Sequence, residues 1–104
     1  MRYLRLKKNT HFQKLFKRGK RVFSPHITLL YAPSPVPVMG IALSKKHGKA
    51  VRRNRLKRVL RAAYADSLNC LATTCSVVIL PKPGEDISYA VAKRELLFCF
   101  KRID

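Results

Sequence analysis

The sequence predicts a fold of the α+β class, a two-layer sandwich in which helices pack on a small sheet. Three observations lead to this class. Segments with the 3.6-residue apolar period of a helix occur near the start, in the middle and at the end of the chain. Short apolar runs bounded by proline or glycine, typical of strands, lie between them. A length of 104 residues, 47% of them hydrophobic, suits one domain over residues 1–104 with a small core.

The first predicted helix covers residues 11–18. Asn9 or Thr10 can cap its start, and Gly19 can end it. Its apolar side chains share one face at the spacing i, i+3, i+4: Phe12, Leu15 and Phe16. Such a face is typical of a helix that packs on the core. The alternative is a platform on which single-stranded bases stack on the two phenylalanines.

Three strands are expected next, over residues 21–23, 26–32 and 38–44. Pro25 separates the first two, because proline cannot donate the hydrogen bond that a sheet needs. Prolines at positions 33, 35 and 37 predict a turn before the third strand. Gly40 is expected to be a weak point or a bulge in that strand.

A long basic helix is expected over residues 50–67, after Gly48. Its core stripe contains four apolar residues: Leu56, Val59, Leu60 and Ala63. At 100° per residue from Leu56, a polar surface at about 100–200° contains Lys57, Arg61, Asn54 and Arg58. Arg55 lies at about 260° and Arg53 at about 60°. The helix therefore presents cations on both sides of its buried stripe, which suits a protein wedged between two RNA elements.

A late strand over residues 76–80 and a last helix complete the chain. Asp86 or Ser88 is expected to cap this helix, which reaches about residue 102. Four of its residues are expected to face inward: Val91, Leu97, Phe98 and Ile103. Three are expected to face water: Lys93, Arg94 and Lys101. The order of helix, two or three strands, helix, strand and helix fits an α+β or an α/β sandwich.

Charge is the strongest indication of function. The chain has 23 Lys and Arg against five Asp and Glu, a net charge of +18, and residues 1–65 contain no carboxylate side chain. Residues 45–61 read KKHGKAVRRNRLKRVLR, in which nine of 17 residues are basic. Because such self-repulsion is relieved by a polyanion, we expect a nucleic-acid partner rather than only a solvated face. No apolar run approaches the ~20 residues of a membrane span, and we expect no membrane partner.

Enzyme chemistry carried by the protein itself is not expected. The five carboxylates form no convincing acid–base or metal-binding pair, the three histidines have no evident nucleophile, and no GxxxxGK[ST] loop occurs. Three cysteines without CxxC spacing are expected to be free, mostly buried thiols in a reducing cytoplasm: Cys70, Cys75 and Cys99. We therefore expect no catalytic residue and no tightly bound metal in this chain.

Several residues around the basic helix are candidates for binding RNA. Asn54 lies between two arginines, where it could bond a base edge or a ribose hydroxyl, or simply occupy the helix surface. An anion-binding turn is expected just before the helix, from Ser44, Lys45, Lys46 and Gly48. Arginine holds phosphate through a planar fork, whereas lysine acts as a point charge.

The segment GKAVRRNRLKR at residues 48–58 resembles the signature of the bacterial ribonuclease P protein subunit, whose centre is an Arg-Asn-Arg triplet, here Arg53, Asn54 and Arg55. The resemblance extends to Leu-Lys-Lys at residues 6–8, to the two phenylalanines before Gly19, to Ser-Lys-Lys at 44–46 and to Lys-Pro at 82–83. It thus covers almost the whole chain in the same order.

The resemblance implies three helices on a four-stranded sheet in the order αβββαβα, with a left-handed βαβ crossover around the basic helix, whereas the general rule predicts a right-handed one. It implies a subunit of an endoribonuclease that helps a catalytic RNA to remove the 5′ leader of precursor tRNA. The RNA, with Mg²⁺ bound mainly by it, would perform the hydrolysis. The implied partners are this RNA and precursor tRNA in the cytoplasm, without a required homo-oligomer.

The resemblance also assigns two sets of site residues. The set against the catalytic RNA is Ser44, Lys45, Lys46, Arg53, Asn54 and Arg55, with Arg58 adjacent and able to serve either RNA. The set in the cleft for the leader is Phe12, Phe16, Lys57 and Arg61. Relatives often carry an aromatic on the cleft-lining strand, where this chain has Leu30. Tyr31 is one residue further on and would point away, unless a bulge intervenes.

Two other functions remain open at this point. A structural RNA-packing protein of the ribosomal type would have a similar composition, and only the triplet-centred signature argues against it. A DNA-binding regulator would need helix-turn-helix geometry or a dimer seam, and neither is visible. A protein-only nuclease would need more carboxylates.

Overall fold

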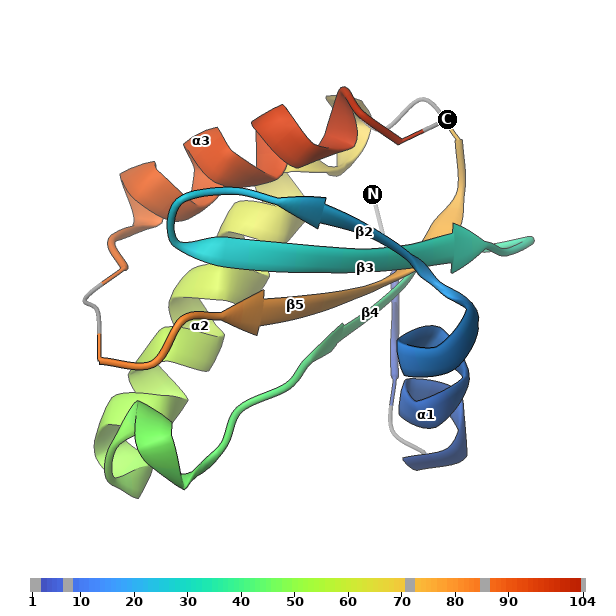
Figure 1. Cartoon of the computed structure of the whole chain (residues 1–104). Helices are drawn as coiled ribbons and strands as arrows, with labels where there is room; N and C mark the ends of the chain where they lie inside the picture. Colours follow the sequence, from blue (N-terminus) through green and yellow to red (C-terminus); the bar gives the residue numbers. More distant parts are fainter. Residues whose placement is uncertain (1–2, 7–8, 71–72, 85–86, 104) are drawn as a thin grey trace.

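A mixed sheet forms the centre of the computed structural model, which describes residues 3–6, 9–70, 73–84 and 87–103 (Figure 1). Its strands are β1 (Leu4–Arg5), β2 (Lys20–Phe23), β3 (Ile27–Pro33), β4 (Val38–Ile41) and β5 (Cys75–Pro81). The helices are α1 (Asn9–Arg18), α2 (Ala50–Ser67) and α3 (Tyr89–Phe100), and two short 3₁₀ helices are η1 (Lys45–His47) and η2 (Leu68–Cys70). The strand order is β1-β4-β5-β3-β2.

The four expected strands and three expected helices are present in the predicted order αβββαβα, and the bounds of α2 are those predicted. Three details differ. The two-residue strand β1 adds a fifth strand, parallel to β4, and two residues are too few to show a period. Helix α1 begins at Asn9, so Asn9 and Thr10 lie in its first turn instead of capping it. Strand β4 ends at Ile41, and residues 45–47 form η1.

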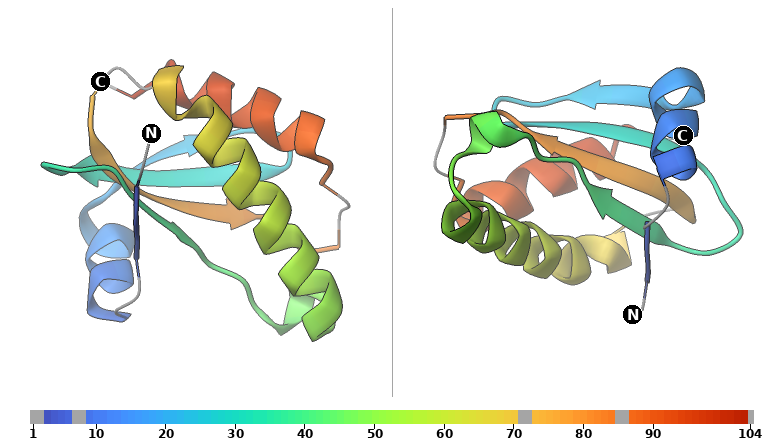
Figure 2. Two further views of the ribbon diagram at one scale, coloured as in Figure 1. Left: turned by 180° about the vertical axis from the view of Figure 1, so that it is seen from behind. Right: turned by 90° about the horizontal axis from the view of Figure 1, so that it is seen from below.

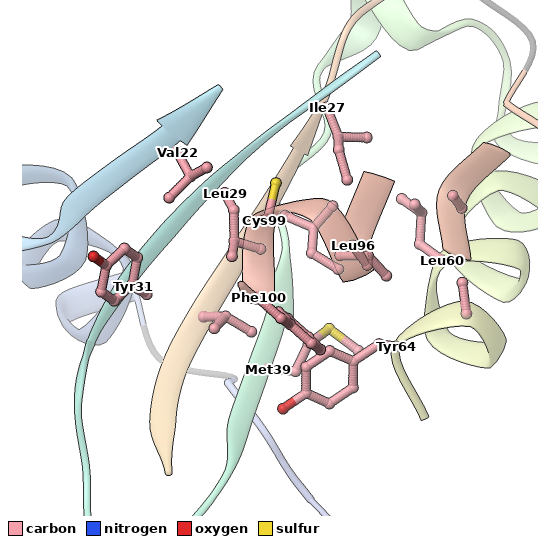
Figure 3. Close-up of a cluster of buried hydrophobic side chains, with 14 of the residues drawn as sticks. Val22, Ile27, Leu29, Tyr31, Met39, Leu60, Tyr64, Leu96, Cys99 and Phe100 are labelled. Atoms are coloured by element: carbon pink, nitrogen blue, oxygen red, sulfur yellow. The ribbon is translucent and has the colours of Figure 1, made fainter. Parts of the chain in front are cut away.

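The two faces of the sheet carry different helices (Figure 2). Helices α2 and α3 pack together on one face and enclose the larger hydrophobic cluster, which Figure 3 shows. Its centre is Tyr64, fully buried, with its ring edge-to-face against Tyr3 at 4.8 Å and Phe100 at 6.0 Å between centroids. On the other face, α1 covers a smaller cluster of Leu15, Leu30 and Val78.

Helix α3 presents a different face to the core from the one expected. Phe98 is 40% exposed and lies under the Arg102 guanidinium, 3.7 Å from its ring centroid. Val91 packs half-buried against the larger cluster and Ile103 is buried, both as predicted, whereas Leu97 is only half-buried. The buried residues of the helix are Ala92, Glu95, Leu96, Cys99 and Phe100. The prediction was wrong because it placed no charged residue in the core, whereas Glu95 is buried.

Glu95 joins α3 to the turn between β2 and β3. Its Oε1 lies 2.7 Å from Ser24 Oγ and accepts hydrogen bonds from the backbone N–H of His26 at 2.6 Å and of Ile27 at 3.2 Å. Its Oε2 lies 2.5 Å from His26 Nδ1. Burial raises the pKa of Glu95, but the hydrogen bonds from Ser24 and His26 outweigh burial and hold the pKa below its ordinary value. The ionised carboxylate therefore holds α3 to the turn between β2 and β3. We call this set of hydrogen bonds the Glu95 clasp.

Candidate nucleic-acid interface

The start of α2 is open to an anion. Gly48 has φ +99°, a backbone conformation that side chains with a Cβ rarely adopt, and it turns the chain from η1 into the helix. Lys49 stands at the N-cap without a side-chain hydrogen bond to the first turn, which contains no acidic residue. The positive end of the helix dipole therefore meets no side-chain cap from Lys49 and no acidic side chain in the first turn, which favours an anion at this end.

His47 holds the loop before α2 against the sheet. It is buried, its Nδ1 accepts a hydrogen bond from the Ser44 N–H at 2.9 Å, and its Nε2 lies 2.6 Å from the Pro81 carbonyl oxygen. A carbonyl only accepts, so Nε2 carries the proton and the ring is neutral when both bonds form. Ser44 and Lys46 are thereby presented on an anchored loop, both exposed; the side chain of Lys45 lies outside the described part.

The local sequence around His47 gives no indication of its structural role. Its partner Pro81 is 34 residues away, so nothing in the local pattern could have shown this contact. The predicted anion-binding turn thus depends on a long-range hydrogen bond to the end of β5.

The cations of α2 lie on two sides of the helix, as the helical projection predicted, and four of them line two grooves. Arg52 and Arg55 line the first groove, between α2 and the start of α3, together with Tyr89. Lys57 and Arg61 line a second groove of about 170 Å³, together with Arg5 and the β4 residues Met39, Gly40 and Ile41. We call the second one the β4-edge groove. Asn54 and Arg58 are exposed on the helix.

Arg53 differs from the other cations of the helix. It is half-buried, and its Nε is buried without a hydrogen-bond partner among the described residues. A buried donor without a partner costs about 1–3 kcal/mol. Within the described part of the chain, the Arg53 side chain is therefore anchored with one hydrogen bond missing.

Phe12 of α1 lies beside the β4-edge groove. Phe12 is half-buried and packs so closely on Gly40 that a Cβ at this glycine would lie 2.8 Å from its ring. Gly40 itself lines the groove with Lys57 and Arg61. Phe16 is 40% exposed, while Leu15 takes the core position of the helix. The structure thus brings Phe12, Lys57 and Arg61 together around one glycine.

Leu30 and Tyr31 point to opposite faces, as the alternation of strand side chains predicted. Leu30 is fully buried under α1, and Tyr31 is buried in the cluster beneath α2 and α3. Residues 27–33 of β3 pair one by one with β5, so no bulge changes this alternation. Tyr31 therefore contributes nothing to the face that carries α1.

The cysteines are free: Cys75 and Cys99 are buried and Cys70 is exposed. Burial raises the pKa of both Cys75 and Cys99 to about 11. Within the described ranges, no three His, Cys, Asp or Glu residues lie together as metal ligands would. None of the described helices combines the length and apolar character needed to cross a membrane.

Comparison with known proteins gives one consistent result. The family model described as Ribonuclease P matches residues 1–104. The ribonuclease P protein component of Bacillus velezensis is 37% identical over 101 residues, covering 94% of this chain and 87% of that protein. The component of Maridesulfovibrio salexigens is 34% identical, covering 89% and 81%.

Solved structures agree with the sequence matches. The ribonuclease P protein of Thermotoga maritima superimposes with a TM-score of 0.84 at 27% identity, covering 96% of this chain and 97% of that one. The protein from Staphylococcus aureus gives 0.80 at 25% identity, covering 94% and 93%.

Proposed function

The chain belongs to the bacterial ribonuclease P protein family, which makes it the protein subunit of the ribonucleoprotein that processes the 5′ end of precursor tRNA, and on this premise we propose which of its surfaces bind which RNA. Membership in this family implies association with the ribonuclease P RNA. It also replaces the alternatives of a ribosomal-type packing protein and a DNA-binding regulator.

The surface for the catalytic RNA comprises the loop before α2 together with the triplet and Arg58 of the helix: Ser44, Lys45, Lys46, Arg53, Asn54, Arg55 and Arg58. Two observations support this assignment. His47 anchors the loop, and the start of α2 has no side-chain cap. A phosphate of the RNA would lie at the positive end of the helix dipole, next to the cations of this surface.

The surface for the 5′ leader is the β4-edge groove with its neighbouring aromatics: Phe12, Phe16, Lys57 and Arg61. The observation that carries this proposal is Gly40, which touches the Phe12 ring and lines the groove with both cations. Single-stranded RNA is bound by such a combination, in which aromatic rings stack on bases while cations hold the backbone. The two grooves on opposite sides of α2 let one helix contact both RNAs.

The catalytic step belongs to the RNA in this proposal. The family's activity is Mg-dependent, but the described residues offer no cluster of carboxylate or imidazole ligands that fits the ion. We therefore assign Mg²⁺ to the RNA and give the protein two tasks. It screens the repulsion between catalytic RNA and substrate, and it grips the leader upstream of the cut, so that precursor is preferred over product.

Two structural expectations are part of the same proposal. The β4–α2–β5 connection is left-handed, which is supported by Figures 1 and 2: β4 and β5 are parallel neighbours, and α2 lies on the far side of the sheet in the view of Figure 1. Residues 1–104 act as one RNA-binding domain in the cytoplasm without a required homo-oligomer.

Reconstitution tests the proposal as a whole. A 5′-extended tRNA precursor is incubated at low Mg²⁺ with the protein, with a bacterial ribonuclease P RNA, or with both. We expect cleavage at the mature 5′ end only when both are present, because the protein supplies charge screening that the RNA lacks at low Mg²⁺. Cleavage by the RNA-free protein, or failure of the protein to rescue the RNA, would contradict the proposal.

Truncating the exposed aromatic of α1 tests the leader surface. We expect Phe16→Ala to weaken holoenzyme binding of precursor about tenfold and to leave mature tRNA unchanged, because losing one stacked base costs about 1–3 kcal/mol. The measurement is the Kd of each RNA, with a non-cleavable linkage in the precursor.

Phe98→Ala on α3 is the matched control, since Phe98 is also 40% exposed but lies on the helix layer across the sheet. Its precursor affinity is expected to equal that of the unchanged protein. Equal losses for precursor and mature tRNA in Phe16→Ala would count against a leader site.

A further inference from the structure

Helix α1 leaves part of its side of the sheet uncovered. It crosses the strands with Phe12 against Gly40 of β4 and Leu15 packed with Leu30 and Val78. The adjacent row of the same face runs across four chain segments, through Phe23, Thr28, Leu80 and Ala42. None of these four side chains is buried. We call them the open row; in Figure 1 this face is turned to the viewer, and α1 lies at one end of it.

Register places the Phe23 ring on this face. Val22 belongs to the cluster beneath α2 and α3, so its neighbours Arg21 and Phe23 point to the opposite side. Phe23 pairs with Thr28, two residues before Leu30. Its side chain is 68% exposed, the largest exposure of any described phenylalanine. Exposing such an aromatic ring to water on an edge strand is unfavourable, and the ring contributes nothing to the core.

The chemistry around the open row suits RNA. Thr28, Leu80 and Ala42 are half-buried and mostly apolar, and Arg21 is exposed on the same face. No residue before Asp66 carries a carboxylate, so strands β2, β3 and β4 add no negative charge. A protein partner for an apolar patch would not require this one-sided charge, whereas a single strand of RNA is complementary to a ring flanked by cations.

Phe23 is the accessible aromatic ring on the α1 side of β2 and β3. Leu30, on the same face of the sheet, is covered by α1, and Tyr31 points to the other face. Phe23 lies on the neighbouring strand, diagonally across from Leu30, and its ring is accessible. This is the nearest aromatic on the α1 side of β2 and β3.

We propose that Phe23 stacks on a base of the precursor's 5′ leader, so that the leader path continues from α1 along the open row to the β2 edge of the sheet. This inference rests on the proposed leader surface and adds a contact to it. The contact is reached only by leaders long enough to cross the row from the β4 side. Arg21 holds the backbone next to the stacked base.

Leader length and fluorescence together test the proposal. Precursors with leaders of increasing length, each with a non-cleavable linkage, are bound to holoenzymes that carry Phe23, Phe23→Ala or Phe98→Ala. We expect Phe23→Ala to lose about fivefold to tenfold in affinity for the longer leaders and nothing for the shortest. A second set of precursors carries 2-aminopurine at successive leader positions, because stacking quenches its fluorescence. One position is expected to brighten in Phe23→Ala and not in Phe98→Ala.

The outcomes separate this inference from the proposed function. If Phe16→Ala weakens precursor binding while Phe23→Ala changes neither affinity nor fluorescence, the leader surface stands and the role of Phe23 is wrong. If neither variant has an effect, the leader surface itself is wrong. A loss in Phe23→Ala that is equal for all leader lengths also overturns the extended path. Circular dichroism is expected to show all variants folded, since the Phe23 ring is mostly in solvent.

Discussion

Replacing Glu95 with alanine is expected to lower the free energy of unfolding by about 3 kcal/mol or more. The carboxylate meets Ser24 Oγ, the His26 imidazole and two backbone N–H groups inside the fold. Without it, buried donors of the β2–β3 turn lose their acceptor, and α3 loses its polar connection to the sheet.

Thermal unfolding measures this loss. For a domain of this size, roughly 4–8 °C in Tm corresponds to 1 kcal/mol, so Tm is expected to fall by more than about 10 °C. Glu95→Gln keeps one acceptor oxygen and is expected to lose less. Arg94→Ala, at an exposed position on the same helix, is the control and is expected to change Tm little. A Glu95→Ala protein as stable as this control would show that the clasp is dispensable.

The same clasp predicts how stability depends on pH. Because the folded-state pKa of Glu95 lies below its value of 4.5 in the unfolded chain, the carboxylate contributes stability above about pH 4.5. This contribution is lost as pH falls through the folded-state pKa, since the folded protein must then take up a proton against its hydrogen bonds. The stability difference between the unchanged protein and Glu95→Gln is therefore expected to be full near neutral pH and to shrink in acid.

Removing both cations of the β4-edge groove is expected to produce the largest change in RNA binding. Lys57→Ala with Arg61→Ala should weaken precursor binding about 30-fold, roughly 2 kcal/mol, because each charge-assisted contact to a phosphate is worth about 1 kcal/mol or more. Mature tRNA lacks the leader and should bind as before. A plot of the logarithm of the precursor association constant against the logarithm of salt concentration should become less steep by about 1.4. Each phosphate contact on a single strand contributes about 0.7 to this slope.

A second double variant with the same change of charge distinguishes direct contact with the leader from the effect of the protein's overall positive charge. Arg94→Ala with Lys101→Ala removes two exposed cations from the α3 end of the chain. This variant should bind precursor almost as well as the unchanged protein and keep its salt slope. If both double variants weaken precursor and mature tRNA alike, the cations of α2 act only through the summed positive charge, and the groove is not a leader site.

Local patterns were sufficient for the elements with a strong period. Helix α2 has the predicted bounds, because Gly48 and an uninterrupted apolar stripe mark it without any help from distant residues. Its two-sided charge follows from 3.6 residues per turn, with Arg55 in one groove and Lys57 and Arg61 in the other. The opposite orientation of Leu30 and Tyr31 could likewise be predicted from the alternation of side chains between the two faces of a strand.

Long-range contacts account for what sequence reasoning missed. From the local sequence, Glu95 is expected at the surface, because its hydrogen-bond donors in and next to the β2–β3 turn lie 68–71 residues away. The inward face of α3 differs from the predicted one for this reason. His47 has no local indication of burial, because its carbonyl partner lies on β5. Tyr64 lies beyond the predicted stripe, and Tyr3 and Phe100 complete its pocket.

Composition, period and a short motif thus establish the family, the order of elements and the identity of the cations, because each of these is written in neighbouring residues. Which aromatic rings remain accessible, and which cations share a groove with them, depends on how α1 crosses the sheet and where β4 meets α2. That arrangement follows from packing between segments far apart in the chain, where close contacts such as Phe12 on Gly40 are set by the shapes of both partners.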